Sequence, residues 1–164
     1  MTLFRRLRSR GRGDGYSFVE LIVVSALLVI LASAAVPLAT VTMQRQREVE
    51  LRRTLRELRT AIDRYKDAVD LGTISVPERD IEAAGYPPDL ETLVTGEPLA
   101  GEDGTGRLRF LRRVPLDPIT RSREWGLRSY QDEPDARRWG GGNVYDVFSL
   151  AQGTALDGTR YRDW

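Results

Sequence analysis

The sequence predicts an α+β protein in which one long N-terminal helix packs by its second half on a small antiparallel sheet of about three strands. Two observations predict the helix: an uncharged apolar run over 21–41, and an amphipathic pattern that continues to residue 71. A third predicts the sheet, because short stretches rich in β-branched and aromatic residues follow in the second half. The 164 residues leave room for one small domain after the helix. The expected regions are 1–15, 16–43, 44–71 and 72–164.

The apolar run has the length of a membrane-spanning helix. Residues 21–41 carry no charge, and at about 1.5 Å of rise per residue they span roughly 31 Å, the thickness of a bilayer's hydrocarbon core. The segment 1–15 before it holds five arginines and one acid, and positive charge flanking a span is retained in the cytoplasm. We therefore expect a cytoplasmic N-terminus, a single span within 16–43, and a domain on the far side of the membrane.

Glu20 lies in the first turn of the expected helix, directly before the uncharged run. An acid in a spanning helix costs on the order of 2.5 kcal/mol or more unless it has a partner. One interpretation is an acid at the helix edge that reaches water. The other is a partnered acid: cleavage after Gly15 would create an amine on Tyr16, and such a pair at about 4 Å is worth roughly 4 kcal/mol at an effective dielectric near 20. That amine could belong to the same helix or to a neighbouring subunit.

An apolar stripe continues the helix beyond the span. From Leu51 to Val69 apolar side chains recur at intervals of 4, 3, 4, 3 and 4 residues, with charged residues between them. The stripe either packs under the chain's own domain, which is the commoner role, or forms a seam with other subunits. Gly72 predicts the end of the helix near Asp70 to Gly72, and Pro37 predicts a kink, because proline removes a backbone hydrogen bond.

Short elements are expected in the domain. Asp89 can cap a helix within PPDLETLVTG, whose apolar face holds Leu90, Leu93 and Val94. The stretches 73–88 and 97–106 are expected to be loops, the first with a helical turn around 78–84, and Gly140 to Gly142 to be a turn between the last two strands. The predicted strands are 108–114, 125–130 and 144–149.

Composition argues against catalysis and nucleic-acid binding. The chain has no His, which removes Ser-His-Asp triads and the usual zinc ligand sets, and it has no Cys to form a disulfide. Its formal net charge is +1, so it has no overall attraction for nucleic acid. Several carboxylates occur in Asp-Pro or Asp-Gly pairs, which are typical of turns. We predict no catalytic residues and no enzyme activity.

The junction GYSFVELIVV resembles the N-terminus of type IV pilins and of the pseudopilins of type II secretion systems. The matching residues are Gly15, Tyr16, Glu20 and Pro37, which fall where the family has them. In that family a prepilin peptidase cleaves after the glycine and methylates the new amine, and the mature subunits polymerise through their N-terminal helices. The resemblance implies cleavage between Gly15 and Tyr16, N-methylation of Tyr16, and assembly through Tyr16, Phe18 and Glu20. At Pro37 it implies a segment that unwinds when the subunit leaves the membrane; a kink that is merely tolerated there is the alternative.

The second half is similar to the major, G-type pseudopilin. Tyr86-Pro87 before a helix, then FLRRVPLDP, Trp125 and YDVFSL follow in the family's order. This implies an inner-membrane precursor that assembles with copies of itself into a periplasmic filament driving protein export across the outer membrane. An assembly platform and minor pseudopilins would be its further partners. The alternative is a type IV pilin or minor pilin that acts as a binding module at a filament surface or tip, favoured by the arginines at positions 121, 123, 128, 137 and 138.

The major pseudopilin family has a calcium site in the loop after its SL dipeptide, and this chain departs from that pattern. Its loop reads SLAQGTALDG, with Gln152 and uncharged residues in place of the family's aspartates. Leu150 and Asp157 are the remaining candidate ligands, with Asp163 nearby, whereas calcium takes six to eight oxygen ligands. An ordinary Asp-Gly turn, held by packing of Tyr161 and Trp164, is the competing interpretation. No cofactor is expected to be required.

Overall fold

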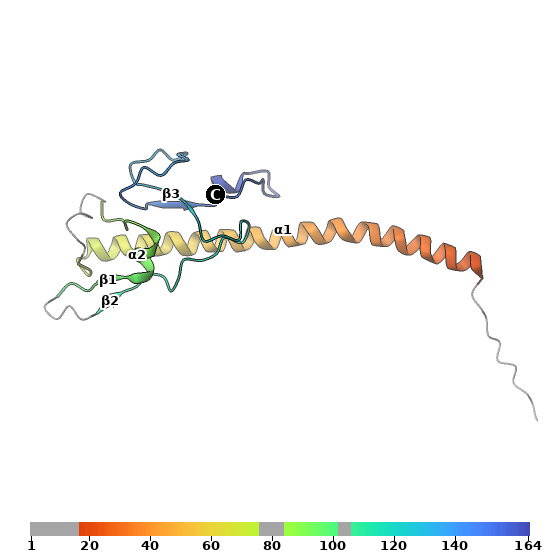
Figure 1. The fold of residues 1–164 in the computed structure, drawn as a ribbon, viewed down its shortest axis with the longest axis horizontal. Coiled ribbons are helices and arrows are strands. Elements are labelled where there is room, and N and C mark those ends of the chain that lie inside the picture. Colours follow the sequence, from red (N-terminus) through yellow and green to blue (C-terminus); the bar gives the residue numbers. More distant parts are fainter. Residues whose placement is uncertain (1–16, 76–83, 102–105) are drawn as a thin grey trace, which may run out of the picture. The chain divides into compact units, whose positions relative to one another are not determined.

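The computed structural model describes residues 17–75, 84–101 and 106–164, except for the side chains of 34–38. The chain divides into two compact units, Met1–Thr40 and Val41–Trp164. The class is α+β, as predicted, with one long helix and short antiparallel strand pairs (Figure 1). The expected helical turn around 78–84 lies almost wholly outside the described residues.

Helix α1 runs from Phe18 to Asp70 without interruption. It ends where the sequence predicted. Gly72 has a left-handed φ of 63° and donates its N–H to the carbonyl of Val69, while Thr73 donates to Ala68. These two bonds form a Schellman motif, which satisfies carbonyls that the helix end leaves without partners. A glycine is favoured at this position because a side chain strains the left-handed conformation.

The apolar stripe of α1 is buried under the chain's own domain. Leu51, Leu58 and Ile62 are 0% exposed, and Val69 is partly buried. The first of the two interpretations of the stripe is therefore confirmed. The core comprises α1 residues and residues of the segments that cover them, all within the second unit; its largest fully buried apolar members are Leu51, Leu55, Leu58, Ile62, Tyr65, Leu93, Val144 and Val147.

Helix α2 spans Leu90–Thr95 and has the predicted caps. Asp89 accepts a hydrogen bond from the backbone N–H of Thr92 at 2.7 Å. Gly96 closes the other end with a φ of 75°. A Cβ at Gly96 would lie 2.3 Å from the carbonyl oxygen of Leu108, so the close approach of β2 (Arg107–Leu108) also requires glycine. Leu90 and Leu93 are buried, and Val94 packs against the core.

The strands form two separate antiparallel pairs within the described residues, and the prediction of one sheet of about three strands is wrong. β1 (Glu97–Pro98) pairs with β2 (Arg107–Leu108), so 97–106 is not wholly a loop. β3 (Gly126–Arg128) pairs with β4 (Asp146–Phe148), within two of the predicted stretches. Near the end of the described residues lies a short 3-10 helix, η2 (Tyr161–Asp163).

Of the first predicted strand, 108–114, only Leu108 belongs to a strand. The backbone hydrogen bonds of the residues that follow it give the reason. The amides of Phe110 and Leu111 both donate to the carbonyl of Leu93, at 2.9 Å each. This commits the backbone after β2 to the end of α2 instead of to a neighbouring strand. Pro115 then lacks an N–H for any ladder.

In the first unit, α1 exposes apolar side chains along its length. Phe18 is 78% exposed, and Leu21 to Leu31 include nine large apolar side chains that are 48% to 68% exposed. Because they occupy nearly consecutive positions, they cover all sides of the helix. Across the helical residues whose side chains are described, no stretch has both the length and the apolar character needed to cross a membrane.

Candidate functional site

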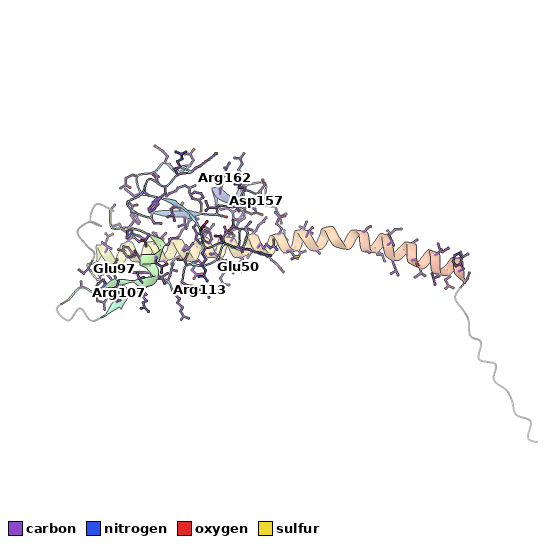
Figure 2. The ribbon with its side chains drawn as sticks, viewed as in Figure 1. Glu50, Glu97, Arg107, Arg113, Asp157 and Arg162 are labelled. Carbon is purple, nitrogen blue, oxygen red and sulfur yellow. The ribbon has the colours of Figure 1, made fainter. Side chains whose placement is uncertain are left out.

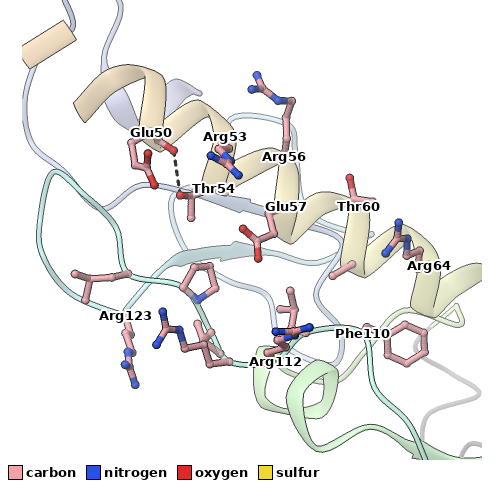
Figure 3. Close-up of a pocket in the computed structure, with 16 residues that line it drawn as sticks. Glu50, Arg53, Thr54, Arg56, Glu57, Thr60, Arg64, Phe110, Arg112 and Arg123 are labelled. Atoms are coloured by element: carbon pink, nitrogen blue, oxygen red, sulfur yellow. Dashed lines mark hydrogen bonds between the residues drawn. The ribbon is translucent and has the colours of Figure 1, made fainter. Parts of the chain in front are cut away.

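A groove of about 1150 Å³ lies between α1 and the segment after β2. One wall is the exposed side of α1 from Glu50 to Arg64. The other is the irregular stretch from Phe110 to Leu116, joined by Arg123 (Figure 3). The buried residues Ala61 and Leu111 contribute apolar surface between the walls. We call this cavity the basic groove.

Six arginines line the basic groove, all of them exposed: Arg53, Arg56, Arg64, Arg112, Arg113 and Arg123. Figure 3 shows Arg112 and Arg123 across the groove from α1, and Figure 2 shows Arg113 projecting from the ribbon. None of the six makes a side-chain hydrogen bond or an ion pair with the part of the chain that the structure describes. Their donors are available to a ligand.

Two glutamates interrupt this positive charge. Glu50 and Glu57 lie two helical turns apart on α1, and both line the groove (Figure 3). Within the described residues neither carboxylate forms an ion pair. The groove thus presents a mixed pattern with a net charge of +4, and it differs from a uniformly basic surface.

In the loop considered for calcium, the candidate ligand Asp157 already binds groups of the protein. Asp157 accepts hydrogen bonds from the Thr159 hydroxyl at 2.6 Å and the Thr159 amide at 3.0 Å, and it pairs with Arg52 at 2.7 Å. The hydrogen bonds from the Thr159 side chain and backbone are the main cause that holds the pKa of Asp157 below its usual 3.8. The hydrogen bond and positive charge of Arg52 lower this pKa further. Leu150 is 47% exposed, and the described residues contain no group of three or more acids that could hold a metal.

The same loop is held by packing, as the competing interpretation proposed. Tyr161 is buried and its ring meets that of Trp164 edge to face at 5.4 Å. The Tyr161 hydroxyl donates to Glu48 of α1 at 2.9 Å, and the Leu156 amide donates to the same carboxylate oxygen. Burial raises the pKa of Tyr161 above 10.0, with the Glu48 carboxylate adding to the shift and Gln44 opposing it. The loop after β4 is therefore fastened to α1.

The residues predicted for processing and assembly lie at the start of the chain. Gly15 and Tyr16 fall outside the described residues. Phe18 and Glu20 occupy the first turn of α1 with exposed side chains, and Glu20 makes no ion pair within the described residues. Helix α1 passes through Pro37, whose side chain is not described, so the kink there stays a prediction.

Sequence reasoning missed the basic groove. It singled out arginines at 121, 123, 128, 137 and 138, of which Arg123 alone lines the groove. Arg128 instead forms an ion pair with Asp146 at 3.0 Å, and its side chain is only 13% exposed. The signal that could have found the groove is the pair Arg53 and Arg56 on the exposed side of a helix, together with Arg112 and Arg113. Because the two pairs lie more than 50 residues apart, no local sequence pattern connects them.

Asp117 belongs to an Asp-Pro pair, which is typical of turns, and the structure shows that it is also a buried anchor. It is 0% exposed and accepts hydrogen bonds from the Ser149 hydroxyl at 2.5 Å and the Ile119 amide at 2.7 Å. The Ser149 oxygen in turn accepts from the Ala151 amide at 3.1 Å. Asp117 thus joins the turn after the groove wall to the loop after β4.

Comparison with known proteins adds no relative: no family model, curated protein or solved structure matches this chain.

Proposed function

We propose that this chain is the precursor of a structural subunit of a type II secretion pseudopilus. The observation that carries the proposal is the start of α1, where large apolar side chains are exposed on all sides between Phe18 and Leu31. Burying one such side chain stabilises a protein by about 1.5 to 3 kcal/mol. A helix with this surface requires a membrane or a bundle of neighbouring helices around it.

The sequence supports both environments in succession. The uncharged run 21–41 continues through residues 34–38, whose side chains are not described, and it has the length of a span. Cleavage after Gly15 would leave this run at the start of the mature chain, where it can leave the membrane for the core of a filament. The proposed partners are further copies of this chain, prepilin peptidase, an inner-membrane assembly platform and minor pseudopilins. The domain would lie in the periplasm.

The domain fits a structural role. Its core lies wholly within the second unit, so the apolar start of α1 is not needed to complete it. Glu20 would serve assembly, because its carboxylate can pair with the amine of Tyr16 in a neighbouring subunit. Calcium is not part of the proposal.

The deciding experiment measures the N-terminal mass of the protein extracted from membranes with prepilin peptidase present and absent. We expect a product that begins at methylated Tyr16 when the peptidase is present. An intact N-terminus in cells with active peptidase would reject the precursor proposal.

The basic groove favours a second candidate function, a pilin that acts as a binding module. A filament subunit should be abundant and should cross-link to itself through cysteines placed in the first turns of α1. A binding module should be scarce and should retain ligand binding when assembly is blocked. Counting copies per cell and cross-linking in membranes separates the two.

A further inference from the structure

The basic groove carries charge that the described part of the chain does not neutralise. Six arginines against two glutamates give it a net charge of +4, although the whole chain has a formal net charge of +1. Guanidinium groups bind carboxylates through paired, charge-assisted hydrogen bonds. A ligand for this surface therefore has several acidic groups.

The wall opposite α1 adds uncharged donors. The backbone N–H groups of Arg112, Arg113 and Val114 make no hydrogen bond with the described residues, and the first two residues are exposed. Backbone N–H groups are strong donors that are normally paired with protein or water. Together with the guanidinium groups they favour a ligand rich in carboxylate and carbonyl oxygens.

The groove has the length of a short peptide. Glu50 and Arg64 are 14 residues apart on α1, which corresponds to about 21 Å at 1.5 Å per residue. An extended chain covers that length in about six residues. Phe110 and Val114, which also line the groove, offer apolar surface between the charged side chains.

We propose that the basic groove binds an extended acidic segment of another protein, about six residues long, in which acidic and apolar side chains alternate. The acidic side chains contact the arginines, and the apolar ones lie against Phe110 and Val114. Glu50 and Glu57 disfavour a phosphate polymer, whose charge is continuous, whereas a peptide can place uncharged groups beside them. This proposal goes beyond the filament function and does not depend on it.

A second copy of this chain is a poorer fit, judged from the described residues. Asp63 and Asp67 are exposed, but they lie on helix α1 and not in an extended segment. In the acidic loop around Glu133, Asp132 already accepts bonds from the amides of Ser129 and Gly140, at 2.7 and 3.0 Å. Self-association through the groove is accordingly an outcome that would overturn the proposal.

The test uses the full chain in dodecyl maltoside and a fluorescein-labelled peptide of sequence Glu-Val-Asp-Val-Glu-Val. Binding is followed by fluorescence anisotropy at 50 mM salt, with the amide peptide Gln-Val-Asn-Val-Gln-Val as the uncharged control. We expect the acidic peptide to bind and the amide peptide not to bind. The double variant Arg53→Glu, Arg113→Glu should weaken it at least tenfold. The matched control, Arg137→Glu with Arg138→Glu, changes charge equally outside the groove and should weaken binding less than threefold.

Amide hydrogen exchange adds a readout that net charge does not affect. Peptide binding should slow exchange at Arg112, Arg113 and Val114 relative to the loop around Glu133. The proposal is overturned if both double variants weaken binding equally, or if no protection appears at these amides. It is also overturned if polyphosphate binds the groove and the peptide cannot displace it. Finally, it is overturned if sedimentation shows self-association that the groove variant abolishes while the peptide does not bind. An N-terminal mass that rejects the filament precursor leaves each of these results unaffected.

Discussion

Arg59 on α1 donates a hydrogen bond from Nε to Oδ1 of Asp146 on β4 at 2.7 Å. Its Nη2 also donates to the carbonyls of Val147 and Trp164, at 3.1 and 3.0 Å. The other Asp146 oxygen accepts from Arg128 of β3 at 3.0 Å. One arginine and one aspartate therefore join the helix to the second strand pair and to the segment after it.

Replacing Arg59 with alanine should lower the free energy of unfolding by about 2 kcal/mol, because hydrogen bonds to charged groups contribute about 1.5 to 3 kcal/mol. The Arg59 side chain is 38% exposed, which keeps the expected loss in the lower half of that range. Urea unfolding followed by circular dichroism measures it. Arg138→Ala, at an exposed residue, should change stability by less than about 0.5 kcal/mol. Equal effects from the two variants would contradict a specific role for Arg59.

Asp117 should be among the most sensitive polar residues of the domain. Asp117→Ala removes the acceptor for the buried Ser149 hydroxyl and for the part-buried amides of Ile119 and Thr120, leaving all three donors without this partner. We expect a loss of about 3 kcal/mol or more, since an unsatisfied buried group costs about 1 to 3 kcal/mol. Ser149→Ala removes one donor to this carboxylate and also the acceptor of the Ala151 amide. Because Asp117 keeps its two backbone hydrogen bonds, the loss should be smaller, about 2 kcal/mol. If Ser149→Ala destabilises more than Asp117→Ala in urea unfolding, this assignment is wrong.

Acid should weaken the loop that Asp157 holds. Hydrogen bonds from Thr159 and the charge of Arg52 lower the pKa of Asp157 below 3.8 in the folded chain. Its contribution to stability is therefore present above the unfolded value near 3.8 and is lost as the pH falls through the folded pKa. Thermal melts from pH 5 to pH 2 should show a smaller drop for Asp157→Asn than for the natural sequence. Glu133→Gln, at an exposed acid of another loop, serves as the control.

Calcium should leave the stability of the domain unchanged. The Asp157 carboxylate already bonds to Thr159 and Arg52, so a cation would have to displace Arg52 from it. A ligand that binds the folded state specifically raises its melting temperature by mass action. Because we expect no such binding, melting temperatures in 5 mM calcium and in excess EDTA should agree within about 1 °C. A rise of several degrees in calcium that Asp157→Asn removes would establish a calcium site in the loop.

Substituting Glu20 should block assembly and spare processing. Glu20→Gln keeps the size of the side chain but removes the charge that would pair with the Tyr16 amine of a neighbouring subunit. We expect normal cleavage by mass spectrometry and at least a tenfold loss of filaments in sheared fractions. Ser25→Ala, in the same exposed apolar stretch, is the matched control. Normal filament yield from Glu20→Gln would show that Glu20 is an acid at the helix edge.

Elements with a local signal could be predicted from the sequence. The end of α1 depends on Gly72, and α2 depends on Asp89 and Gly96, residues that act within a few positions of where they stand. The buried stripe of α1 follows from a helical period that is printed in the sequence. The strand pairs were harder to predict, because the Leu93 carbonyl binds the amides after β2 and this contact spans 17 residues.

The sequence by itself determined that this chain has a long helix with an uncharged apolar run over 21–41, an amphipathic continuation and a small α+β domain. Each of these follows from periodicity, capping or charge along the chain. Only the tertiary structure decided that Asp117 is a buried anchor and that arginines 48 to 70 residues apart face one groove. The physical reason is that a helix or a turn needs contacts between near neighbours, whereas a cavity or a shared carboxylate requires distant segments packed together.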